Sequence, residues 1–190
     1  MTQTATYTME AFIDDVKKIF ASTKDPLAQA QAVSDHMEDL LAEPDWLQEK
    51  LNLPEEGGFG RYDLHQDQED GAPDPGFLLM CTVQKPGQDN LPHDHGAAWV
   101  VYGVYQGTIK QTKWRWFYPG EGVDSPQIKE TGNFDQGEGK VAFFLPGEIH
   151  DTVNVTGGRA LVVRLESQKL TEVIRYQYDP KANTVTKMDR

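Results

Sequence analysis

Two histidines separated by one residue are the first feature of this sequence whose residue types and spacing could support chemistry. His93 and His95 lie in the segment 91–96, LPHDHG. Side chains along a β-strand alternate between its two faces, so residues two apart share a face. On a strand, both imidazoles would therefore point the same way and could bind one metal ion. The alternative is a pair of polar surface histidines with no ligand.

A third histidine lies in a comparable setting further along the sequence. His150 follows an apolar run at 141–145 and a Pro146-Gly147 turn, and it stands at the start of another β-rich run. Asn154 comes four residues later. An imidazole from this segment would add a third candidate ligand to the pair at His93 and His95.

Together the two segments resemble the two sequence motifs of the cupin superfamily. The first runs from Pro92 to the glycine turn at Gly107, and the second is the segment that contains His150. The resemblance implies a mainly β cupin fold, a double-stranded β-helix or jelly-roll barrel. It also implies that three histidines bind one metal ion: His93, His95 and His150. Most cupins add a Glu five residues after the second His, but that position is Val100, so the ligand set would be three neutral imidazoles.

Within the cupins, the sequence resembles the three-histidine thiol dioxygenases, the group of cysteine dioxygenase and 3-mercaptopropionate dioxygenase. The likeness extends from Gly60 to about Glu166. It includes Arg61-Tyr62, Leu64-His65-Gln66-Asp67, Gly76-Phe77-Leu78, Pro86-Gly87-Gln88 and Gly103-Val104-Tyr105. The resemblance implies an Fe(II) site, with Ni, Mn or Zn as other candidates, where a substrate thiolate and O₂ bind. By position, it also implies that Arg61 binds the substrate carboxylate.

The resemblance is incomplete on the strand after the third histidine. That family has a Ser-x-His-x-Tyr triad there, whereas Val162, Arg164 and Glu166 occupy the three positions here. The substrate therefore need not be a thiol. Arg164 and Glu166 should share one strand face, since they are two residues apart. On the barrel interior, Arg164 would bind an acidic substrate and Glu166 would orient it; on the outside, the two would be a solvent-facing pair.

Four further residues are candidates for the site. Tyr102 should face inward and offer its phenol to substrate or oxygen, unless it is a core tyrosine. Trp99 is a candidate substrate contact, and the alternative is packing between the barrel and its helical cover. Asp94 would support the ligands from behind or cap a turn. Glu148 is a fourth ligand, a general base or a solvated loop carboxylate.

The elements that must position these residues fall into a helical part and a β-rich part. Apolar residues recur at helical spacing over 12–20 and 27–41, Asp25-Pro26 marks a helix start, and Pro44 ends that helix. From Pro54 onward, short β-rich runs alternate with Gly and Pro turns, which is typical of an antiparallel sandwich or barrel. The candidate strands are 77–83, 97–105, 109–117, 141–145, 151–155 and 160–165, with an edge strand or hairpin over 176–188. We expect a helical segment over 1–57 that packs on a cupin barrel over 58–190.

The composition excludes several classes of partner. The 190 residues include 18 Lys plus Arg and 30 Asp plus Glu, a net charge of −12, which disfavours nucleic acid and anionic membrane surfaces. No apolar run is long enough to span a membrane, and the N-terminal residues lack a signal-peptide pattern. A single Cys fits a reducing compartment, so we expect a cytoplasmic monomer or homodimer.

Three functions are compatible with these features. The leading hypothesis is a mononuclear iron(II) dioxygenase that adds O₂ to a small metal-bound substrate, such as a thiol acid. The second is a cupin lyase, isomerase or hydrolase that uses the metal as a Lewis acid. The third is a non-catalytic cupin that binds a small molecule.

Overall fold

The N-terminal part of the molecule is helical in the computed structural model, which describes residues 6–68, 76–117 and 127–188. The helices are α1 (Met9–Ser22), α2 (Pro26–Ala42) and α3 (Trp46–Leu51). Asp25 caps α2, since its carboxylate accepts a hydrogen bond from Ala28 N at 2.9 Å, and Pro26 occupies the first turn. The predicted helix start is therefore confirmed. No helix in the described ranges is long and apolar enough to cross a membrane.

The remaining elements are strands arranged in two antiparallel sheets. The strands are β1 (Gly60–Gln66), β2 (Leu78–Gln84), β3 (Asp89–His93), β4 (Val100–Gln106), β5 (Thr108–Phe117), β6 (Gln127–Gly137), β7 (Val141–Phe144), β8 (Ile149–Asn154), β9 (Ala160–Glu166), β10 (Tyr176–Asp179) and β11 (Thr184–Lys187). A short 3₁₀ helix, η1 (Leu170–Glu172), precedes β10. One sheet has the order β1-β2-β9-β4-β7 and the other β11-β10-β3-β8-β5-β6. The expected mainly β, double-stranded β-helix fold is confirmed.

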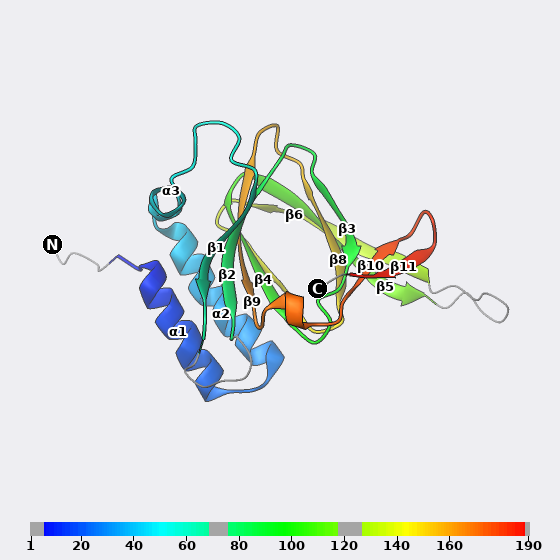
Figure 1. Cartoon of the computed structure of the whole chain (residues 1–190), viewed down its shortest axis with the longest axis horizontal. Coiled ribbons are helices and arrows are strands. Elements are labelled where there is room, and N and C mark those ends of the chain that lie inside the picture. The colour runs from blue at the N-terminus through cyan, green and yellow to red at the C-terminus, as the bar shows by residue number, and fades with distance from the viewer. Residues whose placement is uncertain (1–5, 69–75, 118–126, 189–190) are drawn as a thin grey trace.

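Helices α1 and α2 cover the outer face of the five-stranded sheet (Figure 1). The core between these layers is mainly apolar and includes Phe12 and Met37 from the helices, with Val101 and Leu165 from the sheet. Gly103 lets α2 approach β4 closely, because a Cβ there would lie 2.7 Å from Leu41 Cδ1. This layer holds β4 and β9, which carry the candidate site residues, in a fixed position.

The inner face of the same sheet looks toward the six-stranded sheet. Register pairs Val100 with Glu166 and Tyr102 with Arg164 across β4 and β9, so these four side chains are neighbours on one face. An apolar cluster that includes Val104 occupies the other end of this face. The barrel interior is therefore apolar at one end and polar at the other.

The predicted strands match the structure in most places, with three omissions. β1, β3 and β6 were not predicted, whereas the C-terminal hairpin over 176–188 was. The shared strand on which the argument for the His-x-His pair depended is not present, because His93 ends β3 and His95 lies in the segment that follows. β3 stops there because Gly96, at φ +58°, turns the chain away from the sheet. The division at residues 57 and 58 stays a prediction.

Candidate metal centre

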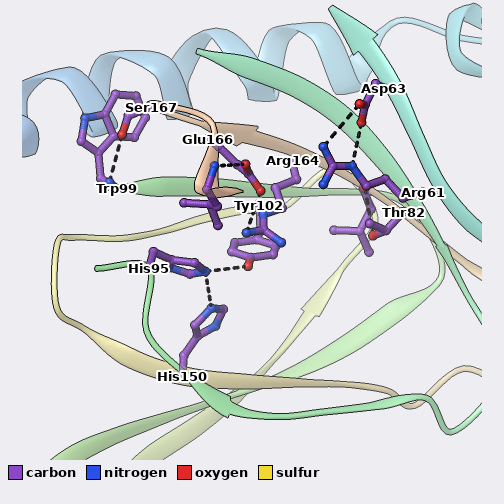
Figure 2. Close-up of polar contacts among 12 residues, drawn as sticks. Arg61, Asp63, Thr82, His95, Trp99, Tyr102, His150, Arg164, Glu166 and Ser167 are labelled. Carbon is purple, nitrogen blue, oxygen red and sulfur yellow. Dashed lines mark hydrogen bonds and ion pairs between the residues drawn. The ribbon is translucent and has the colours of Figure 1, made fainter. Parts of the chain in front are cut away.

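Three histidines converge at the polar end of the barrel interior. Strand register places His93 of β3 opposite His150 of β8, and the segment after β3 brings in His95. One ring nitrogen from each residue lies within 4.8 Å of the others. The Nε2 atoms of His95 and His150 are 3.4 Å apart (Figure 2). Two nitrogens that each bind one ion at about 2.1 Å are separated by roughly 3.0–3.4 Å, so this spacing fits shared coordination.

A directional series of hydrogen bonds fixes the tautomer of His150. Gln136 Nε2 donates to two carbonyls, Tyr102 O at 2.8 Å and Lys140 O at 2.9 Å, and so turns its Oε1 toward Gln111. Gln111 Nε2 donates to that oxygen at 3.0 Å, which leaves Gln111 Oε1 facing His150 Nδ1 at 3.0 Å. An amide oxygen only accepts, so His150 Nδ1 must donate. The Nε2 lone pair therefore faces the point where the three rings meet.

The other two imidazoles complete the donor set. His93 Nδ1 lies 2.8 Å from Leu91 O, a carbonyl that only accepts, so His93 also presents a bare Nε2. His95 Nε2 is 3.2 Å from the Tyr102 hydroxyl, and its buried Nδ1 has no hydrogen-bond partner among the described residues. Bare nitrogens that face one another are poorly satisfied unless they share a proton or a cation. The three residues fit a divalent metal ion that takes nitrogen ligands.

Burial keeps these imidazoles neutral at physiological pH. It lowers the pKa of His93 to about 4, with Arg164 contributing in the same direction. Burial, together with the neighbouring histidines and Arg164, holds the pKa values of His95 and His150 well below the usual range. Neutral imidazole is the form that binds metal ions.

A cavity of about 400 Å³ opens beside the histidines. Its walls come from both sheets and from the C-terminal segment, and include His93, Tyr102, Thr152, Arg164, Arg175 and Gln177. This volume is within the range of small-molecule sites. The cavity therefore offers space for a small ligand next to the metal centre.

Arg164 and Glu166 lie on the inner face of the sheet, and do not form the solvent-facing pair that was the alternative. Arg164 Nη2 is 2.9 Å from Glu166 Oε1, but its N–H does not point at the oxygen, so the contact is an ion pair without a hydrogen bond. Arg164 Nε has no hydrogen-bond partner among the described residues. The guanidinium lies over the Tyr102 ring, 5.1 Å from its centroid. Arg164 thus lines the cavity while two of its nitrogens, Nε and Nη2, are buried without an acceptor among the described residues, whereas Glu166 is buried and also accepts from Leu170 N at 3.2 Å.

The structure does not bring Trp99 and Arg61 to the histidines. Trp99 lies on the helical side, where its Nε1 donates to Gln29 Oε1 at 3.1 Å and its ring packs against Phe20. Arg61, near the start of β1, forms a largely exposed ion pair with Asp63 at 2.7 Å and is not among the cavity walls (Figure 2). Tyr102, by contrast, lies between the histidines and Arg164 (Figure 2).

Two carboxylates close to the ligands have structural contacts. Asp94 accepts hydrogen bonds from Gly96 N at 2.8 Å, Tyr176 N at 3.3 Å and the Tyr178 hydroxyl at 2.5 Å, which attaches the C-terminal hairpin to the ligand segment. Glu148 accepts from Leu145 N at 2.6 Å and so caps the turn before β8.

Three residues of the site were not found from the sequence: Gln111, Gln136 and Arg175. Gln111 lies two residues after the apolar Ile109 on β5, so the two side chains share a face, which indicates an inward position. Nothing in the sequence identifies the hydrogen-bond partners of Gln111. Arg175 lies outside the motif segments, and no sequence signal indicates its role.

Comparison with known proteins gives only weak likenesses. Neither a protein-family model nor a curated protein sequence matches the chain. Among solved structures, it is similar to a double-stranded β-helix protein from Klebsiella pneumoniae (16% identity, 63% of this chain and 80% of that one, TM-score 0.44). It is also similar to the Cnp3 cupin domain of Schizosaccharomyces pombe (11%, 64% and 69%, 0.44) and to KdgF from Halomonas sp. (15%, 62% and 86%, 0.40). The fold assignment therefore depends on the strand order described above.

Proposed function

We propose that the protein is a mononuclear metalloenzyme, an iron(II) dioxygenase that adds O₂ to a small acidic substrate such as a thiol acid. One observation carries the proposal: three neutral imidazoles converge beside a cavity that also contains Arg164. Such a ligand set leaves coordination positions open and leaves the charge of the ion uncompensated, which favours an anionic substrate. When bound, Fe(II) would supply Lewis acidity and the electrons that activate O₂.

The residues around the ion would bind and orient the substrate. Arg164 has donors available for an acidic group, and Glu166 holds the guanidinium in place. Burial raises the pKa of Tyr102 to about 12, so its phenol stays protonated at neutral pH. Tyr102 would then donate a hydrogen bond to the substrate or hold a proton there.

Lewis-acid chemistry on the same residues is the second candidate. It is favoured by the residues at the triad positions, because Val162, Arg164 and Glu166 do not reproduce the Ser-His-Tyr set of the thiol dioxygenases. A lyase, isomerase or hydrolase would use the same ion without oxygen. A non-catalytic binding protein would bind the ion and a small ligand without converting the ligand.

Metal content and oxygen consumption together test the proposal. The protein is purified without chelator, analysed for metals, loaded anaerobically with Fe(II), and mixed with cysteine, 3-mercaptopropionate or a diketone in an oxygen electrode. We expect about one ion per chain and oxygen uptake that His150→Ala abolishes. Native occupancy by zinc or nickel without oxygen uptake would contradict the dioxygenase. Product formation in the absence of oxygen would support the Lewis-acid reaction instead.

A further inference from the structure

The C-terminal segment adds a second arginine to the cavity that contains Arg164. Arg175 lies just before β10, is half-buried and lines the same cavity as His93 and Arg164. Among the side chains that the structure describes, none forms an ion pair with Arg175. A half-buried cation without an acidic partner loses part of its hydration, which an anionic ligand would offset.

Backbone contacts fix Arg175 relative to the histidines. Arg175 O accepts a hydrogen bond from Met188 N at 3.0 Å. The next residue, Tyr176, is bonded to Asp94 twice: its O accepts from Asp94 N at 3.0 Å, and its N donates to Asp94 Oδ1 at 3.3 Å. Because Asp94 lies between two of the histidines, the position of Arg175 is coupled to that of the metal centre.

The charges around the cavity do not balance. Glu166 offsets the charge of Arg164, so the pair sums to zero. Arg175 adds one positive charge, and the neutral histidines add none. Burial and the nearby Arg164 both lower the pKa of Arg175, as expected for two cations that approach each other. Asp89 also lines the cavity, but it is exposed, so water screens its charge.

We propose that this cavity binds a small dicarboxylic acid, with one carboxylate at Arg164 and the metal centre and the second at Arg175. The inference deepens the proposed function, on which it rests for the view that this cavity is the substrate site. Two separate arginines and a cavity of about 400 Å³ suit a short diacid better than a monoacid, which would leave one guanidinium unpaired. Arg175 is then the residue that determines specificity for the second acidic group.

Binding of matched acids to the protein loaded with Zn(II), a divalent ion that does not activate O₂, tests this inference. Isothermal titration compares malonate, succinate and glutarate with propionate, butyrate and valerate, which have the same chain lengths. We expect at least one diacid to bind about 10-fold tighter than its monoacid. Arg175→Met should lower the affinity for that diacid by about 10–100-fold and the affinity for the monoacid by less than about 3-fold. Arg175→Lys should restore part of the lost affinity.

Arg115→Met is the matched control, because Arg115 is an exposed arginine of β5 that does not line this cavity. It should leave both affinities unchanged. Equal affinities for diacids and monoacids, no binding of either, or an equal loss for both in Arg175→Met would overturn the inference. Circular dichroism of each variant confirms that it is folded. Since Zn(II) does not support oxygen uptake, failure of the dioxygenase reaction with iron would leave this result intact.

Discussion

The two faces of the five-stranded sheet are built by the same strands but differ sharply in chemistry. On β9, Leu161, Val163 and Leu165 face the helices and belong to an apolar cluster. The intervening residues, among them Arg164 and Glu166, face the barrel interior. Alternation along a strand lets one segment serve both purposes.

The apolar outer face of the five-stranded sheet explains how the fold tolerates a polar inner face. The charged and polar groups of the inner face contribute little net stability, because burying them costs desolvation free energy that their contacts only partly offset. The apolar layer between sheet and helices supplies the stabilisation that the inner face lacks. Substitutions on the outer face should therefore change stability, whereas substitutions at the polar end of the inner face should change binding.

The largest effect is expected from the outer face. Leu165→Ala removes a fully buried side chain beneath the helices and should lower the free energy of unfolding by about 2–5 kcal/mol. Tyr102→Phe, on the inner face, removes only a hydroxyl and should cost less than about 1 kcal/mol. Urea denaturation followed by circular dichroism measures both. Equal losses of unfolding free energy in the two variants would show that both faces contribute to stability to the same extent.

A smaller effect, and one on metal affinity, is expected from the inner face of the opposite sheet. Gln111→Leu removes the acceptor that fixes the His150 tautomer and should weaken metal binding by about 10–100-fold. Gln136→Leu leaves Gln111 in place but frees the Gln111 amide to rotate, so the loss of metal affinity should be smaller than in Gln111→Leu. Competition with a chromophoric chelator gives both affinities. An affinity unchanged in Gln111→Leu would show that the amides have no role in orienting the ligand.

The outer face and the histidines were the parts that could be predicted from the sequence. Local signals suffice for them: the apolar spacing of α1 and α2, the Asp25-Pro26 cap, and the motif around His150. Strands without such signals were missed. β6 is mostly exposed and polar, and β3 contains Pro92, which cannot donate to a sheet and interrupts the pattern.

The remainder of the site depends on pairings between distant residues. Gln111 and Gln136 meet because β5 and β6 form a hairpin, and Gln111 reaches His150 only when β8 lies beside β5. Arg175 arrives through the contact of Asp94 with Tyr176, which are 82 residues apart. No local pattern encodes such contacts, so a single sequence identifies the candidate ligands but not the groups that orient them.

A still smaller effect should come from the glycine that lets the C-terminal segment dock. Gly96 has φ +58°, and a Cβ there would lie 2.1 Å from Ile174 O. Gly139 has φ +72° and open space around its Cβ position, so Gly139→Ala reports the backbone cost alone, about 1 kcal/mol. Gly96→Ala should cost about 1–2 kcal/mol and speed proteolysis of the C-terminal hairpin, which mass spectrometry can follow. Matching proteolysis in the two variants would argue against docking through Gly96.

A last comparison, which is expected to change stability least, separates the two faces by the reactivity of a thiol. Cys81 of β2 is buried on the helical side, and burial raises the pKa of its thiol to about 12, so roughly one molecule in 10⁴ is thiolate at pH 8. The next residue, Thr82, lines the cavity. Thr82→Cys in a Cys81→Ala background should place a thiol of ordinary pKa there, reacting with iodoacetamide about 10³-fold faster than native Cys81. Unfolding in urea should abolish the difference, because it comes from the fold. Rapid labelling of Cys81 in the folded protein would mean that the outer layer opens, and the view of that face as the rigid side of the sheet would then fail.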